Sequence, residues 1–465
     1  MKRIEVSNLQ NGALCESDLF TESGELLVSK GMTITEKHLD IMRRRNIYEV
    51  YAKMADEAEE LHKILTMDFG QLEELHFDDP AHSVLNAPKK FPVPKAMENP
   101  ALKEIKAGQD GLNQLANSEK AKALDNSIKD GAFSDKPVGP ALKLRSVQIS
   151  VGQRTVAYKT EMKTNYTEAL QQVRGILVSI ADNKSMDGTV VRNMVDRFVK
   201  TWVTDRNMTL NLTHSKPTDD DYLFHHSLNV CLLSLNIAAA FGYSEKQVID
   251  IGIAATLHDV GMMLVPQEIF KKKGRLTKDE FYEVQKHSIL GLHLLENITR
   301  LPDSAQFVAY QTHERENGSG YPKQRSGRLI HSFSKIVQIA DVYESLSSPR
   351  EYRDAFLPYK AMETIIKMSR KTLLSNEFVK AFITYMSLFP IGSLVELSDK
   401  TIGKVIHSNE AHFTKPIVSI IAGPQSQLLA SDKIFQIDLL KRQDLQIVRA
   451  VEAKELPNQD IMAGF

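Results

Sequence analysis

Apolar residues recur every three or four positions along much of this chain, and that period predicts helices over most of residues 160–390. Two lead-in helices within 160–203 come first. Their near-heptad spacing suits either a homodimer contact or, the interpretation we favour, packing onto their own domain. From 222 onward, segments such as FHHSLNVCLLSLNIAAAF and FSKIVQIADVYESL each fit a helix of ordinary length. The pattern therefore predicts a mainly α chain with a central all-α domain.

Both ends of the chain carry short apolar runs broken by Gly and polar residues, which predict strands. In residues 1–53, RIEVSNL, GELLVSKG and YEVYA fit strands, and TITEKHLDIMRRRNI fits a helix capped by Thr35. In 391–455, GSLVELS, GKVIHSN, KPIVSIIAG and FQIDLL fit strands. We therefore expect a small α/β module at the N-terminal end and a small β-barrel-like module at the C-terminal end.

Residues 54–158 differ from both neighbours in composition. Pro, Lys, Ala, Asn and Asp dominate, and aromatic residues are few. Such a segment buries too little apolar surface to offset the entropy lost on ordering. We predict a poorly ordered linker that holds one transient helix.

Charge and cysteine content narrow the class of protein. A formal net charge of −1 gives no overall attraction to nucleic acid or to membranes. The first residues lack the apolar stretch of a signal peptide, and no run of about eighteen apolar residues occurs. Of the two cysteines, Cys15 and Cys231, the second lies in an apolar helical run and is expected to be a buried thiol. We predict a cytoplasmic protein with no membrane span and no nucleic-acid partner.

The residues that carry chemistry are histidines and aspartates spread over several predicted helices. The adjacent pair in AATLHDVG is accompanied by four further candidates, so that the set is His226, His258, Asp259, His287, His313 and Asp341. A single helical histidine is usually a structural residue, but four histidines and two aspartates in one region favour a metal site. Imidazole and carboxylate ligands together suit Fe, Mn, Zn or Ni, and mixed sites of this kind are typical of hydrolytic dinuclear centres.

Five segments make the resemblance to a known family explicit. HSLNV, LHDVG, KHSILG, HERENGSGYP and IADVYESLSSPREYR resemble, in order and spacing, the motifs of the HD-GYP subfamily of the HD superfamily. The triplet of the family name is present as Gly320, Tyr321 and Pro322. The resemblance covers about 160–390 and implies an HD-GYP helical domain over 159–390, lead-in helices included. More weakly, 1–53 and PIGSLVELSDKTIGKVI resemble modules that accompany such domains.

The resemblance implies a phosphodiesterase that cleaves a cyclic dinucleotide, most often cyclic di-GMP, with two divalent metal ions, Fe or Mn. It assigns His226, His258, Asp259 and Asp341 to one ion, and Asp259, His287 and His313 to the other, with His258 and Asp259 as the catalytic pair. On the substrate side it places Tyr321 with Gly320 and Pro322, and Arg350 and Arg353 on phosphate. For the two arginines, a solvated helix end is the alternative.

Three positions depart from the family pattern. Thr312 stands where a second histidine is usual, Met262 replaces a lysine that contacts substrate phosphate, and Tyr222 occupies the position of a glutamate found in three-metal members. The first two changes imply weakened activity. Two hypotheses stay open: a slow phosphodiesterase, or a domain of little or no activity that serves as a cyclic-dinucleotide receptor or protein scaffold. Hybrid cyclic GMP-AMP is an alternative substrate.

Overall fold

The computed structural model describes residues 2–52, 104–129, 136–142, 156–204, 210–213, 222–348 and 355–456, apart from short gaps. These gaps are 7–8, 14, 16–18, 22–25, 29–31, 46, 211, 271, 273–275, 410–411, 431–432, 443 and 453–454. The chain divides into two compact units, Met1–Asp68 and Phe69–Phe465, and each is described by itself.

In its described residues, the first unit is a small sheet with one helix, as predicted. Its elements are β1 (Lys2–Glu5), β2 (Leu19–Phe20), β3 (Leu26–Val28), α1 (Glu36–Arg44) and β4 (Glu49–Ala52). The strands pair antiparallel in the order β1-β4-β2-β3. Thr35 caps α1, and Leu39 and Met42 on the buried face of α1 join Val28 and Val50 in one core. The helical and strand periods predicted from sequence therefore meet at a shared apolar core.

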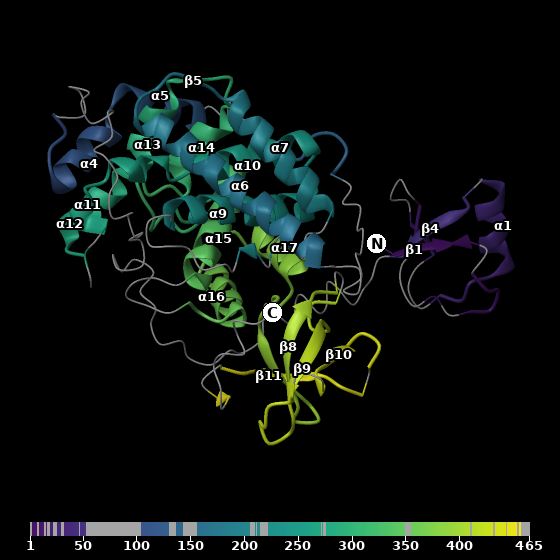
Figure 1. The fold of residues 1–465 in the computed structure, drawn as a ribbon. Coiled ribbons are helices and arrows are strands. Elements are labelled where there is room, and N and C mark those ends of the chain that lie inside the picture. The colour runs from purple at the N-terminus through teal and green to yellow at the C-terminus, as the bar shows by residue number, and fades with distance from the viewer. Residues whose placement is uncertain are drawn as a thin grey trace. The chain divides into compact units, whose positions relative to one another are not determined.

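The second unit is built around a helical domain (Figure 1). Its helices are α6 (Val156–Ala181), α7 (Thr189–Thr204), α9 (Tyr222–Phe241), α10 (Glu245–Leu257), η5 (Val260–Leu264), α11 (Gln267–Phe270), α12 (Lys278–Gln285), α13 (His287–Leu295), α14 (Ser304–Gln311), η6 (Gly327–Leu329), α15 (Ser332–Ser347), α16 (Pro358–Arg370) and α17 (Asn376–Met386). Helix α9 packs against α6, α10, α15 and α17. A helix that is covered on all sides needs apolar residues all round, and α9 has them.

Two segments, Tyr222–Phe241 and Glu245–Leu264, are long and apolar enough to pass a composition test for a membrane span. In the folded chain 89% and 83% of their most apolar windows are buried. The core helices of a globular domain meet the same test, so these two segments are weak evidence for a membrane span.

The prediction that Cys231 is a buried thiol is confirmed, and burial raises its pKa to about 12.

The lead-in helices α6 and α7 pack onto the domain itself. Helix α6 contacts α9, and α7 contacts α10. The periodic positions Val173 and Leu177 of α6 and Val191 and Val195 of α7 are fully buried within the single chain. The apolar stripe that left a homodimer open is therefore largely used inside the chain. A short parallel pairing of β5 (Met186–Asp187) with β6 (Ile298–Thr299) further ties this region to the end of α13.

The interpretation of 54–158 as a poorly ordered linker is wrong over part of its length. Two helices lie there, α4 (Gly108–Ala116) and α5 (Glu119–Lys129), and α4 packs against α12 and α13. Leu112, Leu115 and Ile128 are buried, although their neighbours in the sequence are mostly polar. The error arose because a short amphipathic helix needs only a few apolar residues when a larger domain covers them.

A five-stranded antiparallel sheet forms the small β module expected at the C-terminal end. Its strands are β7 (Leu394–Leu397), β8 (Ile402–His407), β9 (Ile417–Ala422), β10 (Phe435–Asp438) and β11 (Ile447–Ala450), in the order β10-β9-β8-β7-β11. Leu394, Ile402 and Ile421 form its core with Val451. Ser387, just after α17, donates its hydroxyl to the Phe413 carbonyl at 2.6 Å. The module is therefore hydrogen-bonded to the end of the helical domain.

Substitutions at two glycines, Gly261 of η5 and Gly175 of α6, test how closely η5 packs against α13. An alanine Cβ at Gly261 would lie 2.0 Å from the His287 carbonyl oxygen, a backbone atom that cannot move aside. We expect Gly261→Ala to lower the free energy of unfolding by about 3 kcal/mol. Gly175→Ala, in α6 with no atom beyond its own stretch of helix within 4 Å of the new Cβ, should raise it by about 0.5–1 kcal/mol. Denaturant unfolding measures both, and equal stability of the two variants would contradict the close approach of η5 to α13.

Candidate metal centre

The fold brings the six predicted residues together from five places in the helical domain. His226 lies on α9, His258 and Asp259 follow α10, His287 begins α13, His313 follows α14 and Asp341 lies on α15. All are buried except His313, which is partly exposed. A cluster of imidazoles and carboxylates this far from solvent is costly unless its members are paired or bind metal.

Asp259 is the centre of the cluster. Its Oδ1 lies 3.3 Å from Nε2 of His258, 3.4 Å from Nε2 of His287 and 3.3 Å from Nε2 of His313. Its Oδ2 lies 3.6 Å from Nε2 of His226. One carboxylate therefore faces four imidazole nitrogens, two of which, on His287 and His313, approach each other to 2.8 Å.

Two overlapping groups of potential ligands result. His226, His258 and Asp259 form one, and Asp259, His287 and His313 form the other, with the ligand atoms of each group within 4.8 Å of one another. The sixth residue, Asp341, lies beside both. Its Oδ1 is 3.4 Å from Nε2 of His226, and its Oδ2 is 3.9 Å from Nδ1 of His313. The structure thus contains His/Asp groups that suit metal ions, with Asp259 common to both.

The outer nitrogens of the imidazoles show that the donor set fits a metal. Nδ1 of His258 lies 2.8 Å from the Ala255 carbonyl oxygen, and Nδ1 of His287 lies 2.6 Å from that of Val284. A carbonyl can only accept, so each Nδ1 carries the proton and each Nε2 presents a lone pair to the cluster. This is the tautomer that a metal ligand requires.

Unsatisfied nitrogens point the same way. Among the described residues, Nε2 of His226 and Nε2 of His258 are buried and have no hydrogen-bond partner. Buried polar atoms are almost always satisfied in native proteins, and an exception calls for an explanation such as an ion. Both atoms face Asp259, so an ion held there would satisfy them together.

The charge state of the cluster also suits a cation. Burial alone would raise the pKa of Asp259, but the neighbouring His258, His287 and His313 hold it well below its usual range. Burial lowers the pKa of His313, which favours the neutral imidazole. A charged carboxylate at Asp259 and a neutral imidazole at His313 are the protonation states in which these two groups bind metal.

Glu344, which the sequence reasoning missed, orients His226. Its Oε2 lies 2.6 Å from Nδ1 of His226, and its Oε1 accepts from Asn229 Nδ2 at 3.3 Å and from the Ser348 hydroxyl at 2.5 Å. Burial would lower the pKa of His226, but the carboxylates of Glu344 and Asp341 raise it. Glu344 follows Asp341 by one helical turn, and that spacing was the available sequence signal.

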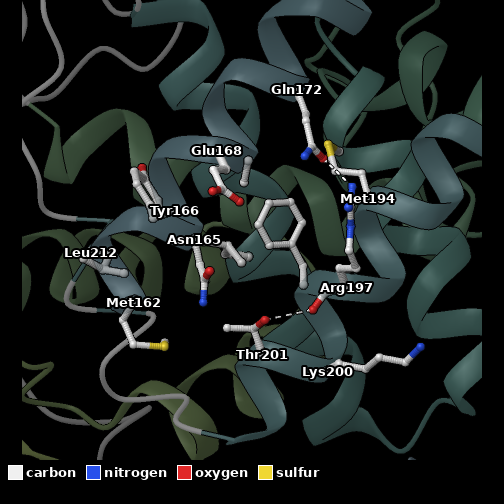
Figure 2. A pocket seen from close by; sticks show the side chains of 13 residues that line it. Met162, Asn165, Tyr166, Glu168, Gln172, Met194, Arg197, Lys200, Thr201 and Leu212 are labelled. Atoms are coloured by element: carbon white, nitrogen blue, oxygen red, sulfur yellow. Dashed lines mark hydrogen bonds between the residues drawn. The ribbon is translucent and has the colours of Figure 1, made fainter. Parts of the chain in front are cut away.

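The hydrogen bonds continue from Glu344 toward a cavity. The Tyr166 hydroxyl donates to Oδ1 of Asn229 at 2.7 Å, and burial raises the pKa of Tyr166, so its proton stays in place. Tyr166 lines a cavity of about 250 Å³ between α6 and α7, which Figure 2 shows together with Met162, Met194 and Arg197. The chain Tyr166–Asn229–Glu344 therefore fixes one side of His226 from the lead-in helices.

The loop that follows His313 brings Tyr321 to the cluster. The rings of Tyr321 and His313 are stacked, with centroids 4.9 Å apart and an angle of 10° between the planes. A Cβ at Gly320 would lie 2.4 Å from the His313 carbonyl oxygen, so the backbone can approach this closely only with glycine. The Tyr321–Pro322 peptide bond is cis. Tyr321, Gly320 and Pro322 thus lie at the site, whereas Arg350 and Arg353 fall outside the described residues.

Glu314 holds this loop from inside. Its carboxylate accepts the backbone N–H groups of Lys323 at 2.8 Å and Arg325 at 2.7 Å. Burial raises the pKa of Glu314 to about 6. Its place beside His313 in the sequence was the only signal for this role, and the sequence reasoning did not use it.

The three residues that depart from the family pattern, Thr312, Met262 and Tyr222, make other contacts in the structure. The Thr312 hydroxyl donates to the Val308 carbonyl of its own helix at 2.7 Å. Met262 is buried in an apolar group with Leu223, Val265 and others. A lysine at that position would place an ammonium among these side chains. Tyr222 stacks beside His226, with ring centroids 6.0 Å apart.

Family models match two parts of the chain: residues 205–374 match the HD domain, and 394–459 match the KOW domain associated with the HD domain. A "Cyclic di-GMP phosphodiesterase PA4108" of Pseudomonas aeruginosa is 28% identical over 55% of this chain and 61% of its own length. The "Cyclic di-GMP phosphodiesterase" of Thermotoga maritima is 37% identical over 34% of this chain and 43% of its own. A "3'3'-cGAMP-specific phosphodiesterase 2" of Vibrio cholerae is 30% identical over 35% and 31%.

The chain therefore spans between about a third and three fifths of the length of these curated relatives. Among solved structures, an HDG"Y"P protein of Bdellovibrio bacteriovorus, Bd1817, aligns with 82% of this chain and 97% of its own at 11% identity and a TM-score of 0.42. The order of the sequence motifs, the helices that the structure shows over this region and the family matches all indicate an HD domain. The chain thus contains an HD domain of the HD-GYP type, followed by the KOW module that is associated with such domains.

Proposed function

We propose that this protein is a metal-dependent phosphodiesterase that hydrolyses a cyclic dinucleotide of the cyclic di-GMP class, in bacterial second-messenger signalling in the cytoplasm. The observation that carries the proposal is the buried cluster around Asp259, in which two imidazole Nε2 atoms have no hydrogen-bond partner among the described residues. The names of the relatives supply the substrate class. The relative named for cGAMP makes the hybrid dinucleotide the alternative substrate.

In this proposal His226, His258, Asp259 and Asp341 would hold one divalent ion, and Asp259, His287 and His313 would hold a second. Two such ions activate water and stabilise the charge that develops in phosphodiester displacement. Mixed nitrogen and oxygen ligands are compatible with Fe or Mn. The carbonyl groups of Ala255 and Val284 and the carboxylate of Glu344 keep three of the imidazoles in the ligating tautomer and orientation.

On the substrate side, Tyr321 is the residue best placed to contact a nucleotide. It lies at the edge of the cluster on a loop whose close backbone approach depends on Gly320, and Pro322 continues this loop. A base or ribose resting against Tyr321 would place its phosphodiester beside Asp259. Arg350 and Arg353 are assigned to phosphate from the sequence alone. A homodimer through residues 160–203 is likewise a proposal from the sequence alone.

A receptor that binds the dinucleotide without cleaving it is the second candidate. The observation in its favour is the pair Thr312 and Met262: the threonine hydroxyl is engaged by its own helix, and the methionine lies in an apolar group. Neither offers a ligand to metal or a cation to phosphate. All six His and Asp side chains are nevertheless present and converge, which favours the enzyme.

Turnover by metal-loaded protein tests the proposal. The purified chain is stripped with a chelator, reloaded anaerobically with Fe²⁺ or Mn²⁺, and incubated with cyclic di-GMP or cyclic GMP-AMP, and the products are separated by chromatography. We expect a linear dinucleotide that forms only after metal is restored. Binding of the intact dinucleotide with no product would move the assignment to the receptor. Absence of both binding and product would overturn the proposal.

A further inference from the structure

Helices α4 and α5 dock onto the helical domain through specific polar contacts. Nζ of Lys286 donates to the Lys106 carbonyl oxygen at 2.7 Å and to both carboxylate oxygens of Glu283 at 2.8 Å. Glu283 in turn accepts the Gly108 N–H at 2.6 Å. Lys286 is 4% exposed and precedes His287 directly. The start of this helical pair is therefore fastened beside one of the candidate metal ligands.

The second helix reaches the loop that carries Tyr321. Asp125 of α5 forms an ion pair with Arg325, lies 3.6 Å from Nζ of Lys323, and accepts the Tyr310 hydroxyl at 3.1 Å. Lys323 and Arg325 belong to the loop, whereas Tyr310 belongs to α14. One carboxylate from outside the HD match, which begins at 205, thus joins the loop to the helix that precedes His313.

Burial makes this contact more than a surface ion pair. The side chain of Asp125 is 13% exposed and that of Arg325 is 9% exposed, and the guanidinium lies 5.4 Å from the centre of the Tyr310 ring. Nη1 of Arg325 is already buried without a hydrogen-bond partner in the described structure. Removing the carboxylate would leave a buried cation without its principal counter-charge, which is costly where an exposed pair would be nearly neutral.

The same two loop residues are held from both sides. Their backbone N–H groups donate to Glu314, and their side chains reach Asp125. Tyr321 lies two residues before Lys323, and its N–H donates to the His313 carbonyl at 3.1 Å. The position of Tyr321 against His313 thus depends both on Glu314 and on Asp125.

We infer that residues 104–129 form a strap on the catalytic domain, and that Asp125 is a positioning residue that holds the loop of Tyr321 in its substrate-binding arrangement. This inference rests on the proposed function for its consequence, nucleotide binding, but not for the contact itself. Because Asp125 contacts Lys323 and Arg325 of this loop, a change in the docking of the strap would alter the nucleotide site.

The test uses the full chain with Asp125→Asn, which removes the charge but keeps the shape, and Asp125→Ala. Glu119→Gln is the matched control, an exposed acid on the same helix. Hydrogen exchange is followed over 314–331 and, for comparison, over α9 and α15. We expect exchange roughly tenfold faster in the loop of both Asp125 variants, with α9 and α15 unchanged and the control like wild type. For cyclic di-GMP, KM should rise more than kcat falls.

The outcomes separate the strap from the proposed function. If wild type shows no turnover, the exchange data alone decide on the strap. Unchanged loop exchange in both Asp125 variants would overturn the inference even if the enzyme is active. Exchange that increases equally in the loop, α9 and α15 would also overturn it, because Asp125 would then support the stability of the whole domain rather than the position of the loop.

Discussion

Asp259→Ala is expected to abolish metal binding at both candidate sites and, with it, turnover. Asp259 is the only member of both ligand groups, and its two oxygens face the nitrogens of His226, His258, His287 and His313. Loss of an outer residue that only orients a ligand costs 10–100-fold in metal affinity or activity, so loss of a shared ligand should cost at least about 10³-fold in turnover. Metal analysis of the purified protein and product chromatography measure the two effects.

Two further variants make this result specific. Asp259→Asn keeps the shape but removes the negative charge that balances the cations, and we expect it to lose metal as well. Asp303→Ala removes an exposed aspartate near the start of α14 and should behave as wild type. Circular dichroism should show that all three variants retain their helices, because the apolar core around α9 is untouched. Full metal content in Asp259→Ala would exclude the arrangement proposed here.

The six candidate ligands could be predicted from sequence because their chemistry is local to each motif. Each lies in a short segment whose residue types and order are distinctive, and the helical period places each segment on a helix. Helix packing then determines whether they meet, and in the structure all six lie together. The fold class followed in the same way, because apolar periodicity determines which faces of the helices are buried.

The supporting residues could not be predicted because their roles depend on which helices lie side by side. Asn229 of α9 donates a hydrogen bond to Glu344 of α15, and Asp125 pairs with Arg325 in a loop 200 residues away in sequence. No local pattern distinguishes them from solvated polar residues. Helices α4 and α5 were missed for a related reason: their few apolar residues are significant only beside the surface that covers them.

Glu344→Gln is expected to weaken metal binding at the first site without unfolding the domain. The single carbonyl oxygen of Gln can still accept from Nδ1 of His226, but its NH2 group then faces the Asn229 donor, and the negative charge that makes the imidazole a stronger ligand is lost. We expect metal affinity to fall roughly 10–100-fold, with His287 and His313 at the second site less affected. Competition with a chelator of known affinity measures the change.

A second buried glutamate distinguishes this effect from the cost of disturbing any buried acid. Glu363 on α16 is 3% exposed, as is Glu344, and pairs with Lys360 at 2.9 Å and Lys367 at 2.6 Å. Glu363→Gln should therefore lower the Tm but leave metal affinity unchanged, whereas Glu344→Gln should lower metal affinity. Equal metal affinity in the two variants would mean that Glu344 supports only the packing of α9 on α15. A loss of metal affinity in Glu344→Gln alone would show that the Glu344 carboxylate supports metal binding through its contact with His226.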